Sequence, residues 1–266
     1  MWLGCILSMI DRIASYVLGD FSKAMHVAKM NSHALAWHPD VLIQRSVTYF
    51  EEMTRNESKM HEMVLNCLPD KMQKNFKTTV QKFTELRNEE LKIKNNFEDK
   101  NLRFACKMES PKTKKTSEFT NTLYDMYLEL PKPLRFNEEH FIDSLNDPKT
   151  ILTTLRLNDE NGDIIGFAKG GPLENYILRA EINDENFGKR NTIFLEPIAL
   201  KMGYWGLGAG HELRQSFLMQ SHTMNFDFLT SFAFRDVIEK RTQSMEKAEF
   251  IFKFDPERWD YYRIDL

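Results

Sequence analysis

Glycine and proline are distributed very unevenly along this chain of 266 residues. Residues 1–98 contain two glycines and two prolines, whereas residues 99–266 contain nine glycines and seven prolines. Because these residue types end helices and form turns, a long stretch with so few of them favours helices. We therefore expect a helical N-terminal region, residues 1–98, followed by a turn-rich domain, residues 99–266.

The first region is expected to hold several helices. Apolar residues recur every three or four positions across residues 3–18, which predicts one amphipathic helix. Pro39 opens a helix expected to reach about residue 68, and Pro69 separates it from a second long helix that ends near residue 97. The apolar stripe of the first helix needs a partner, either the second domain or another copy of the chain. A homodimer through the N-terminal helices is therefore one expectation, and a membrane-surface helix is less favoured because the polar face is not basic.

Composition excludes several classes of protein. Asp11 and Arg12 interrupt the first apolar segment after about ten residues, which is too short for a transmembrane span. The net charge of -3 gives no global attraction to nucleic acid. Three widely spaced cysteines, Cys5, Cys67 and Cys106, match neither a disulfide framework nor a zinc site. We expect a cytoplasmic protein with free thiols and no bound metal.

Short apolar runs alternate with amphipathic stretches after residue 100. Expected strands cover residues 102–108, 151–157, 163–169, 192–200, 226–232, 249–254 and 261–266, and expected helices cover residues 117–130, 137–145, 210–221 and 235–247. Ser117 and Asn137 are the expected N-caps of the first two helices. This order predicts an α/β fold of the α+β kind, with a mixed, mostly antiparallel sheet. A helical crossover makes the strands at 192–200 and 226–232 parallel, and we expect them to splay apart.

A glycine-rich loop lies between one of these strands and the following helix. Gly206, Gly208 and Gly210 alternate after the strand that ends at Leu200. Such a loop lets backbone amides and a helix N-terminus approach a phosphate closely. No Gly-Lys-Ser/Thr follows, which excludes a P-loop, and the glycine spacing does not fit the dinucleotide-binding fingerprint. An acyl-coenzyme A pyrophosphate remains as a ligand, and a tight structural turn without a ligand remains as the alternative.

At this loop the chain resembles the GNAT superfamily of acyl-CoA-dependent N-acyltransferases. The resemblance covers about residues 100–266 and rests on Leu200-Lys-Met-Gly-Tyr204-Trp205-Gly206-Leu-Gly208-Ala-Gly210-His-Glu-Leu213, together with the order of strands and helices. Tyr204, the three glycines and Leu213 match the family pattern in register. Trp205 stands where the family has Arg or Gln, which puts the affinity for the acyl-CoA, and with it the activity, in question.

The resemblance implies an N-acetyltransferase that uses acetyl-CoA and an amine acceptor. Main-chain groups of Ile198 and Leu200 would bind the pantetheine arm. The loop that would hold the pyrophosphate consists of Trp205, Gly206, Leu207, Gly208, Ala209, Gly210 and His211. Four carboxylates after Gly170 could line the acceptor site and suit a cationic amine, although solvation explains them equally well: Glu174, Glu181, Asp184 and Glu185.

Glu196 is the candidate general base, since the family often carries a carboxylate near this place. Strand alternation predicts that it shares a face with Ile198 and Leu200. Its apolar surroundings would favour the protonated form and so make the carboxylate a stronger base. The alternative is a structural carboxylate bound by a donor in the core. Pro197 cannot donate to a strand ladder, which predicts a bulge or an unpaired edge beside it.

The general acid is not identified from sequence. The helix in which the family often has a tyrosine, residues 235–247, contains none. Tyr261 and Tyr262 on the last strand are possible substitutes. Two functional alternatives to an active enzyme remain open: a CoA-binding or ligand-sensing module without catalysis, and an interaction protein whose helical region recruits a partner.

Overall fold

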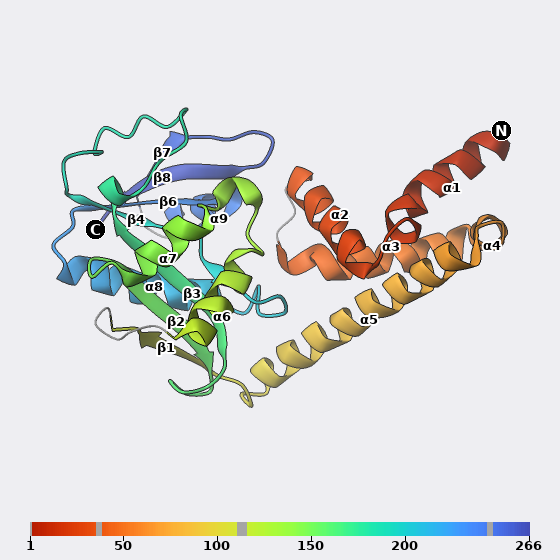
Figure 1. Ribbon diagram of the computed structural model, residues 1–266, viewed down its shortest axis with the longest axis horizontal. Coiled ribbons are helices and arrows are strands. Elements are labelled where there is room, and N and C mark those ends of the chain that lie inside the picture. Colours follow the sequence, from red (N-terminus) through yellow and green to blue (C-terminus); the bar gives the residue numbers. More distant parts are fainter. Residues whose placement is uncertain (1, 36–38, 111–115, 244–246) are drawn as a thin grey trace. The chain divides into compact units, whose positions relative to one another are not determined.

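Helices make up the first part of the computed structural model, which describes residues 2–35, 39–110, 116–243 and 247–266 (Figure 1). The contacts divide the chain into two units, residues 1–95 and 96–266. The first unit consists of α1 (Trp2–Val17), α2 (Phe21–Ala34), the short 3-10 helix η1 (Pro39–Val41), α3 (Leu42–Asn56), α4 (Ser58–Asn66) and most of α5 (Asp70–Glu98). The predicted helical region is therefore confirmed.

One predicted helix is divided in two. The single helix expected from Pro39 to residue 68 is wrong, because α3 ends at Asn56 and α4 begins at Ser58. Glu57 between them leaves the helical conformation, with φ -126 and ψ 28. Its carboxylate accepts hydrogen bonds of 2.7 and 2.5 Å from the Arg12 guanidinium on α1. The break therefore coincides with a tertiary contact between Arg12 and Glu57, which a local sequence pattern does not predict.

An aromatic cluster fills the core of the helical unit. Phe50 of α3 contacts Tyr16, Phe76 and Phe83, with ring centroids 4.6, 5.9 and 6.0 Å apart. Phe21 of α2 packs on Phe83 at 5.3 Å. Rings at these distances stabilise the packing beyond simple burial of area. The cluster therefore joins α1, α2, α3 and α5.

The apolar stripe of α1 is only partly covered. Ile13 and Val17 are buried, but Leu3, Leu7 and Ile10 are 70%, 58% and 41% exposed. The expectation that this stripe would be buried is therefore met at Ile13 and Val17, but not in its first half or at Leu18, which is 59% exposed.

The second unit is built on an eight-stranded mixed sheet (Figure 1). Its strands are β1 (Phe104–Met108), β2 (Ile151–Leu157), β3 (Ile164–Pro172), β4 (Thr192–Leu195), β5 (Ala199–Leu200), β6 (Phe228–Phe234), β7 (Ala248–Phe252) and β8 (Trp259–Asp265). The helices of this unit are α6 (Ser117–Tyr127), α7 (Glu138–Asn146), α8 (Ala209–Thr223) and α9 (Arg235–Thr242), with short 3-10 helices η2 (Lys132–Leu134) and η3 (Leu173–Asn175). The strand order is β1-β2-β3-β4-β6-β8-β7, and β5 pairs with β3 beside this path. The predicted fold class and element order are confirmed.

The strand predicted at residues 192–200 is interrupted in the middle. Its first part, β4, runs parallel to β6 from Thr192 to Leu195. Residues 196–198 leave the strand, and β5 then pairs with β3 and with no other described strand. The predicted parallel pairing and splaying are therefore confirmed, and Pro197 lies in the interruption as expected of a residue without an amide donor.

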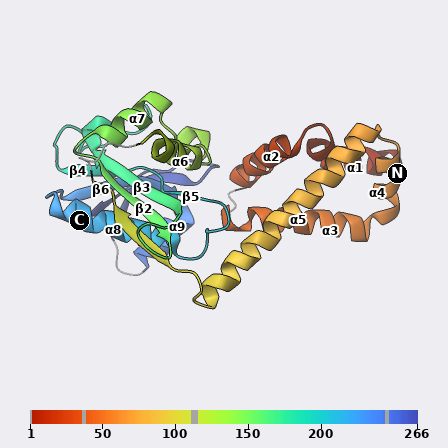
Figure 2. The same cartoon turned by 60° about the horizontal axis from the view of Figure 1, so that its bottom comes forward.

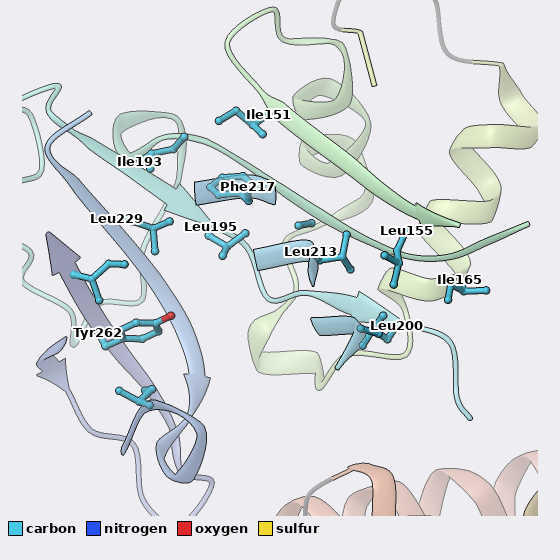
Figure 3. Close-up of a cluster of buried hydrophobic side chains, with 14 residues drawn as sticks. Ile151, Leu155, Ile165, Ile193, Leu195, Leu200, Leu213, Phe217, Leu229 and Tyr262 are labelled. Atoms are coloured by element: carbon cyan, nitrogen blue, oxygen red, sulfur yellow. The ribbon is translucent and has the colours of Figure 1, made fainter. Parts of the chain in front are cut away.

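The sheet separates two layers of helices (Figure 2). Helix α8 lies on one face, and Figure 3 shows its Leu213 and Phe217 among buried strand side chains such as Leu195 and Leu200. Helices α6 and α7 cover the other face, where Phe141 packs against Phe167 of β3. A strand side chain that contacts α8 therefore lies on one face of the sheet, and one that contacts α6 or α7 lies on the other.

Glycine in β3 allows close packing between these layers. A Cβ atom at Gly170 would lie 2.2 Å from the Phe194 carbonyl oxygen and 2.6 Å from the Phe217 ring. A Cβ at Gly166 would lie 2.4 Å from a methyl carbon of Leu200. Such distances are too short for any side chain, so β4, β5 and α8 approach β3 only because these positions are glycine.

Two local predictions need correction. The N-cap of α6 is Thr116, whose hydroxyl accepts from the Phe119 amide, and not Ser117. Helix α9 ends at Thr242, and the predicted continuation falls partly on residues 244–246, which lie outside the described residues. The Asn137 cap is confirmed, since its side chain accepts from the His140 amide at 2.8 Å. Within the described residues, no helix combines the length and apolar character that crossing a bilayer requires.

Candidate functional site

The glycine loop leads from β5 into α8 in a conformation that demands glycine. Gly203, Gly206 and Gly208 have φ angles of 94, 78 and 85 degrees. These angles lie in the left-handed region, which residues with a side chain adopt at a cost of about 1–2 kcal/mol. Gly208 is also the N-cap of α8, so the loop delivers the backbone directly to a helix N-terminus.

The amides of this loop are available to a ligand. Between Gly206 and Gly210, no backbone amide donates a hydrogen bond of normal geometry to the described part of the chain. The amides of His211 and Glu212, by contrast, both donate to the Gly208 carbonyl oxygen, at 2.9 and 3.1 Å. His211 was expected to offer its amide to a phosphate, but that donor is already used within the chain.

The loop fits an anionic group. A Cβ atom at Gly208 would meet no atom within 4 Å, so the space beside the free amides is open. The helix N-terminus adds a partial positive charge at the same place. Free amides, open space and a helix dipole together match the requirements of a bound pyrophosphate.

The other residues predicted to bind the cofactor differ in how deeply their side chains are buried. Leu200 is buried in the core against α8, and Ile198 and Trp205 pack partly buried against the same core. Ala209 is buried as the first residue of α8, whereas Leu207 is half-buried. The side chains of Leu200 and Ala209 therefore anchor the two ends of the loop in the core.

Glu196 lies at the point where β4 separates from β6. Its amide donates to the Lys169 carbonyl oxygen of β3 at 2.9 Å, and the residue is 1% exposed. Its Oε1 accepts hydrogen bonds from the Lys169 ammonium and, at 3.1 Å, from the Tyr176 hydroxyl. Its Oε2 is buried and has no hydrogen-bond partner among the described residues.

The predicted face of Glu196 is wrong. Lys169, which pairs with it, also contacts Ser144 and the Phe141 ring of α7, so Glu196 faces the α7 side of the sheet. Leu200 belongs to the core on the α8 side. Regular alternation would have placed both side chains on one face, but the interruption at residues 196–198 resets the alternation.

Burial shapes the titration of the groups around Glu196. Burial lowers the pKa of Lys169, and the charge of Glu196 offsets part of this effect. Burial, together with the Glu196 charge, raises the pKa of Tyr176 well above its ordinary value. Burial also lowers the pKa of His140, whose ring packs on Tyr176 with centroids 5.4 Å apart. Both Tyr176 and His140 are consequently neutral near pH 7.

The two tyrosines proposed as general acids are committed elsewhere. The Tyr261 hydroxyl donates to Asp184 at 2.8 Å, and burial raises the pKa of Tyr261. The Tyr262 hydroxyl accepts from Arg241 at 3.3 Å and belongs to the core against α8. Neither hydroxyl is brought near Glu196 by the contacts it makes.

The carboxylates expected to line an acceptor site are mostly engaged within the chain. Arg263 of β8 binds Asp184 at 3.3 Å and Glu185 at 2.7 Å. Glu174 accepts from the Arg190 amide at 2.7 Å. The contacts of Asp184 and Glu185 fasten the long connection between β3 and β4 to the sheet, whereas Glu181 is exposed.

Sequence reasoning did not identify the partners of Glu196. Lys169, Tyr176 and Ser144 come from β3, the residue after η3, and α7, which are far apart in sequence. One signal was present: Lys169 is the single charged residue in the apolar run 164–173. A charge alone in a buried strand requires a partner of opposite charge.

No protein-family model and no curated protein sequence matches this chain. The solved structures similar to it include Arabidopsis thaliana NAA60 in complex with acetyl-CoA, at 12% identity over 62% of this chain and 98% of that chain, with a TM-score of 0.42. The ribosomal-protein-S18-alanine N-acetyltransferase from Escherichia coli has 13% identity over 61% of this chain and 93% of that chain, with a TM-score of 0.40. An acetyltransferase of the GNAT family from Streptococcus pneumoniae has 13% identity over 62% and 99%, with a TM-score of 0.38.

Proposed function

We propose that residues 96–266 bind acetyl-CoA and transfer its acetyl group to a primary amine. The observation that carries the proposal is the set of free amides in the glycine loop, next to a parallel strand pair that separates after Leu195. Parallel strands leave a crevice at their carboxyl ends, and free amides at a helix N-terminus bind phosphate. When bound, acetyl-CoA supplies an acyl group activated as a thioester.

The main chain provides the binding groups in this proposal. The amides from Gly206 to Gly210 hold the pyrophosphate. Main-chain groups of Ile198 and Leu200 hold the pantetheine arm, because β5 pairs on one edge with β3 and with no other described strand. An unpaired strand edge binds an extended, amide-containing chain by main-chain hydrogen bonds. Trp205, where the family has Arg or Gln, packs against the core and leaves the phosphate contacts to these amides.

Glu196 is the proposed proton acceptor. Acetyl transfer requires the attacking amine to lose a proton, and a carboxylate in reach of that amine serves as the base. The position of Glu196 directly after the last paired residue of β4, and its Oε2 without a hydrogen-bond partner among the described residues, support this role.

A second candidate function is a CoA-binding module without catalysis. The ion pair between Glu196 and Lys169 favours it, because a carboxylate beside an ammonium is a weaker base. The engagement of Tyr261 and Tyr262 in other contacts favours it as well.

Two measurements distinguish these functions. Coenzyme A and acetyl-CoA are each added to the full chain, and the melting temperature is recorded; both candidate functions require an increase. Acetyl-CoA is then incubated with a polyamine, with free lysine and with peptides that carry a free N-terminus, and the released thiol is measured. Turnover above the rate without protein supports the enzyme, and an increase in melting temperature without turnover supports the module. If neither ligand raises the melting temperature, both functions are rejected.

The cellular location of the protein and its self-association belong to the same proposal. We place the activity in the cytoplasm, because Cys5, Cys67 and Cys106 form no disulfide. The exposed Leu3, Leu7 and Ile10 of α1 support self-association through the N-terminal helices, since exposed apolar stripes favour contact with a partner.

A further inference from the structure

Lys169 and Glu196, at the interruption between β4 and β5, form an unusually buried ion pair. The side chains of Lys169 and Glu196 are 0% and 2% exposed. Removing two full charges from water is costly, and their attraction offsets that cost only when further hydrogen bonds complete the site. Here Ser144 accepts from the Lys169 ammonium at 2.6 Å, and Tyr176 donates to Glu196 at 3.1 Å.

The hydrogen bonds of Glu196 are strongly asymmetric. Both donors, Lys169 and Tyr176, bind Oε1. Oε2 is equally buried and accepts from no described group. A buried acceptor without a donor costs about 1–3 kcal/mol. Of the two oxygens of Glu196, Oε2 is therefore the one that gains more from taking up a proton.

We propose that Lys169 is a positioning residue that controls the proton on Glu196, so that the two side chains accept the amine proton as one unit. The inference rests on the proposed acetyl transfer. In that reaction the amine nitrogen forms a bond to the acyl carbon, the carbon–sulfur bond breaks, and the electron pair leaves on sulfur. The proton released by the amine passes to Oε2 of Glu196, while Oε1 keeps its hydrogen bond from the Lys169 ammonium. The proton then passes from Oε2 to the departing thiolate, which leaves as a thiol.

The groups packed around Glu196 and Lys169 do not compete with this pair for the amine proton. The titratable groups that interact with the charge of Glu196 are Tyr127 of α6, His140 of α7 and Tyr176 after η3. Further out, Arg135 acts on Tyr127, Asp143 on His140 and Asp147 on Tyr176. Burial raises the pKa of both tyrosines and lowers that of the histidine, so all three are neutral near pH 7. Burial lowers the pKa of Lys169 as well, while the charge and the hydrogen bond of Glu196 act in the opposite direction.

The first test needs no substrate. The full chain is labelled with nitrogen-15 at lysine Nζ, and the Lys169 resonance is assigned by its loss in Lys169→Met. In the parent, the Lys169 ammonium should lose its proton at a lower pH than exposed lysines, whose ordinary value is about 10.4. In Glu196→Gln it should lose the proton at a still lower pH, because the carboxylate charge that favours the ammonium is gone. If Lys169 titrates together with the exposed lysines in the parent, the proposal is rejected.

The second test follows the pH dependence of kcat/KM with acetyl-CoA and the most active amine of the panel. In Lys169→Met, the decline in rate on the acid side should move to higher pH by about 1–3 pH units, since an ammonium no longer favours the ionised carboxylate. Lys107→Met is the matched control, because the Lys107 ammonium donates to the Glu160 carbonyl oxygen on a surface hairpin and makes no ion pair among the described residues; its profile should equal that of the parent. An unmoved profile in a folded Lys169→Met variant would show that the lysine is structural.

Two further measurements apply if Lys169→Met does not fold or if no variant shows turnover. If Lys169→Met does not fold, Ser144→Ala replaces it, since this change removes the other hydrogen bond of the ammonium and leaves the charge pair intact. The same acid-side decline should then move to lower pH, because the ammonium binds the carboxylate more closely, and an unmoved decline rejects the proposal. If no variant shows turnover, the proposed acetyl transfer is rejected. The pH at which the Lys169 resonance titrates still tests separately whether Glu196 controls the proton on Lys169.

Discussion

Gly208 offers a direct test of the phosphate-binding loop. Its φ of 85 degrees requires glycine, and a Cβ atom there would enter the open space beside the free amides. Gly208→Val should therefore have two separable effects: backbone strain in the folded chain, and loss of the volume that a pyrophosphate would occupy.

The chain contains a matched control for the strain. Gly188 has a φ of 91 degrees, is exposed, and would likewise meet no atom within 4 Å with a Cβ. It lies in the connection between β3 and β4, far in sequence from the glycine loop. A side chain at either position costs about 1–2 kcal/mol, which for a chain of this size lowers Tm by about 2–8 °C. Gly188→Val and Gly208→Val should therefore lose similar stability.

Only Gly208→Val should lose ligand. Isothermal titration calorimetry with acetyl-CoA should show an affinity at least ten times weaker, corresponding to about 1.4 kcal/mol, whereas Gly188→Val should bind like the parent. Equal affinity in all three proteins would refute the assignment of the loop. Equal weakening in both variants would show that general strain, and not occupied volume, is responsible.

Four further predictions concern other parts of the molecule. Glu196→Gln should retain acetyl-CoA affinity by calorimetry while kcat falls about 100-fold or more, and full turnover at neutral pH would assign the base elsewhere. Gly170→Ala should destabilise the chain by about 1–3 kcal/mol in urea unfolding, because its Cβ would meet the Phe194 carbonyl oxygen at 2.2 Å; an unchanged midpoint would contradict the close packing. Leu7→Glu should abolish any concentration-dependent association seen in sedimentation, whereas Ser8→Glu on the same helix should not, and equal behaviour would exclude this face of α1. Burial lowers the pKa of His61, so the unfolded chain takes up a proton that the folded chain does not; stability in urea should be fully retained above about pH 6.5 and fall below it, and His61→Leu should weaken that slope.

Local patterns predicted the elements well because their causes are local. The absence of turn formers predicted the helical region, and Asn137 predicted the start of α7, since an N-cap acts on amides two or three residues away. The glycine loop was found for the same reason: positive φ angles at Gly206 and Gly208 are a property of the residues themselves.

Features set by distant contacts were not predicted. The break at Glu57 involves Arg12, 45 residues earlier, and the local signal, Asn56 and Ser58 on either side of it, was not used. The partners of Glu196 lie 20 and 27 residues away on other elements, so no spacing rule connects them. The face of Glu196 was misassigned because alternation was assumed to continue through Pro197, although the prediction of an irregularity at that proline already contradicted the assumption.

The interruption between β4 and β5 has a consequence for how such a chain can vary over evolution. In an unbroken strand, a one-residue insertion or deletion moves every later side chain to the opposite face. Here β4 is held by β6 and β3, and β5 is held separately by β3. Between them Glu196 is still bound to β3 through its amide, whereas residues 197–198 carry no strand pairing. Changes of length within residues 197–198 can thus be absorbed without shifting the strands on either side. Selection can then alter the chemistry facing α7 while the loop that enters α8 keeps its geometry.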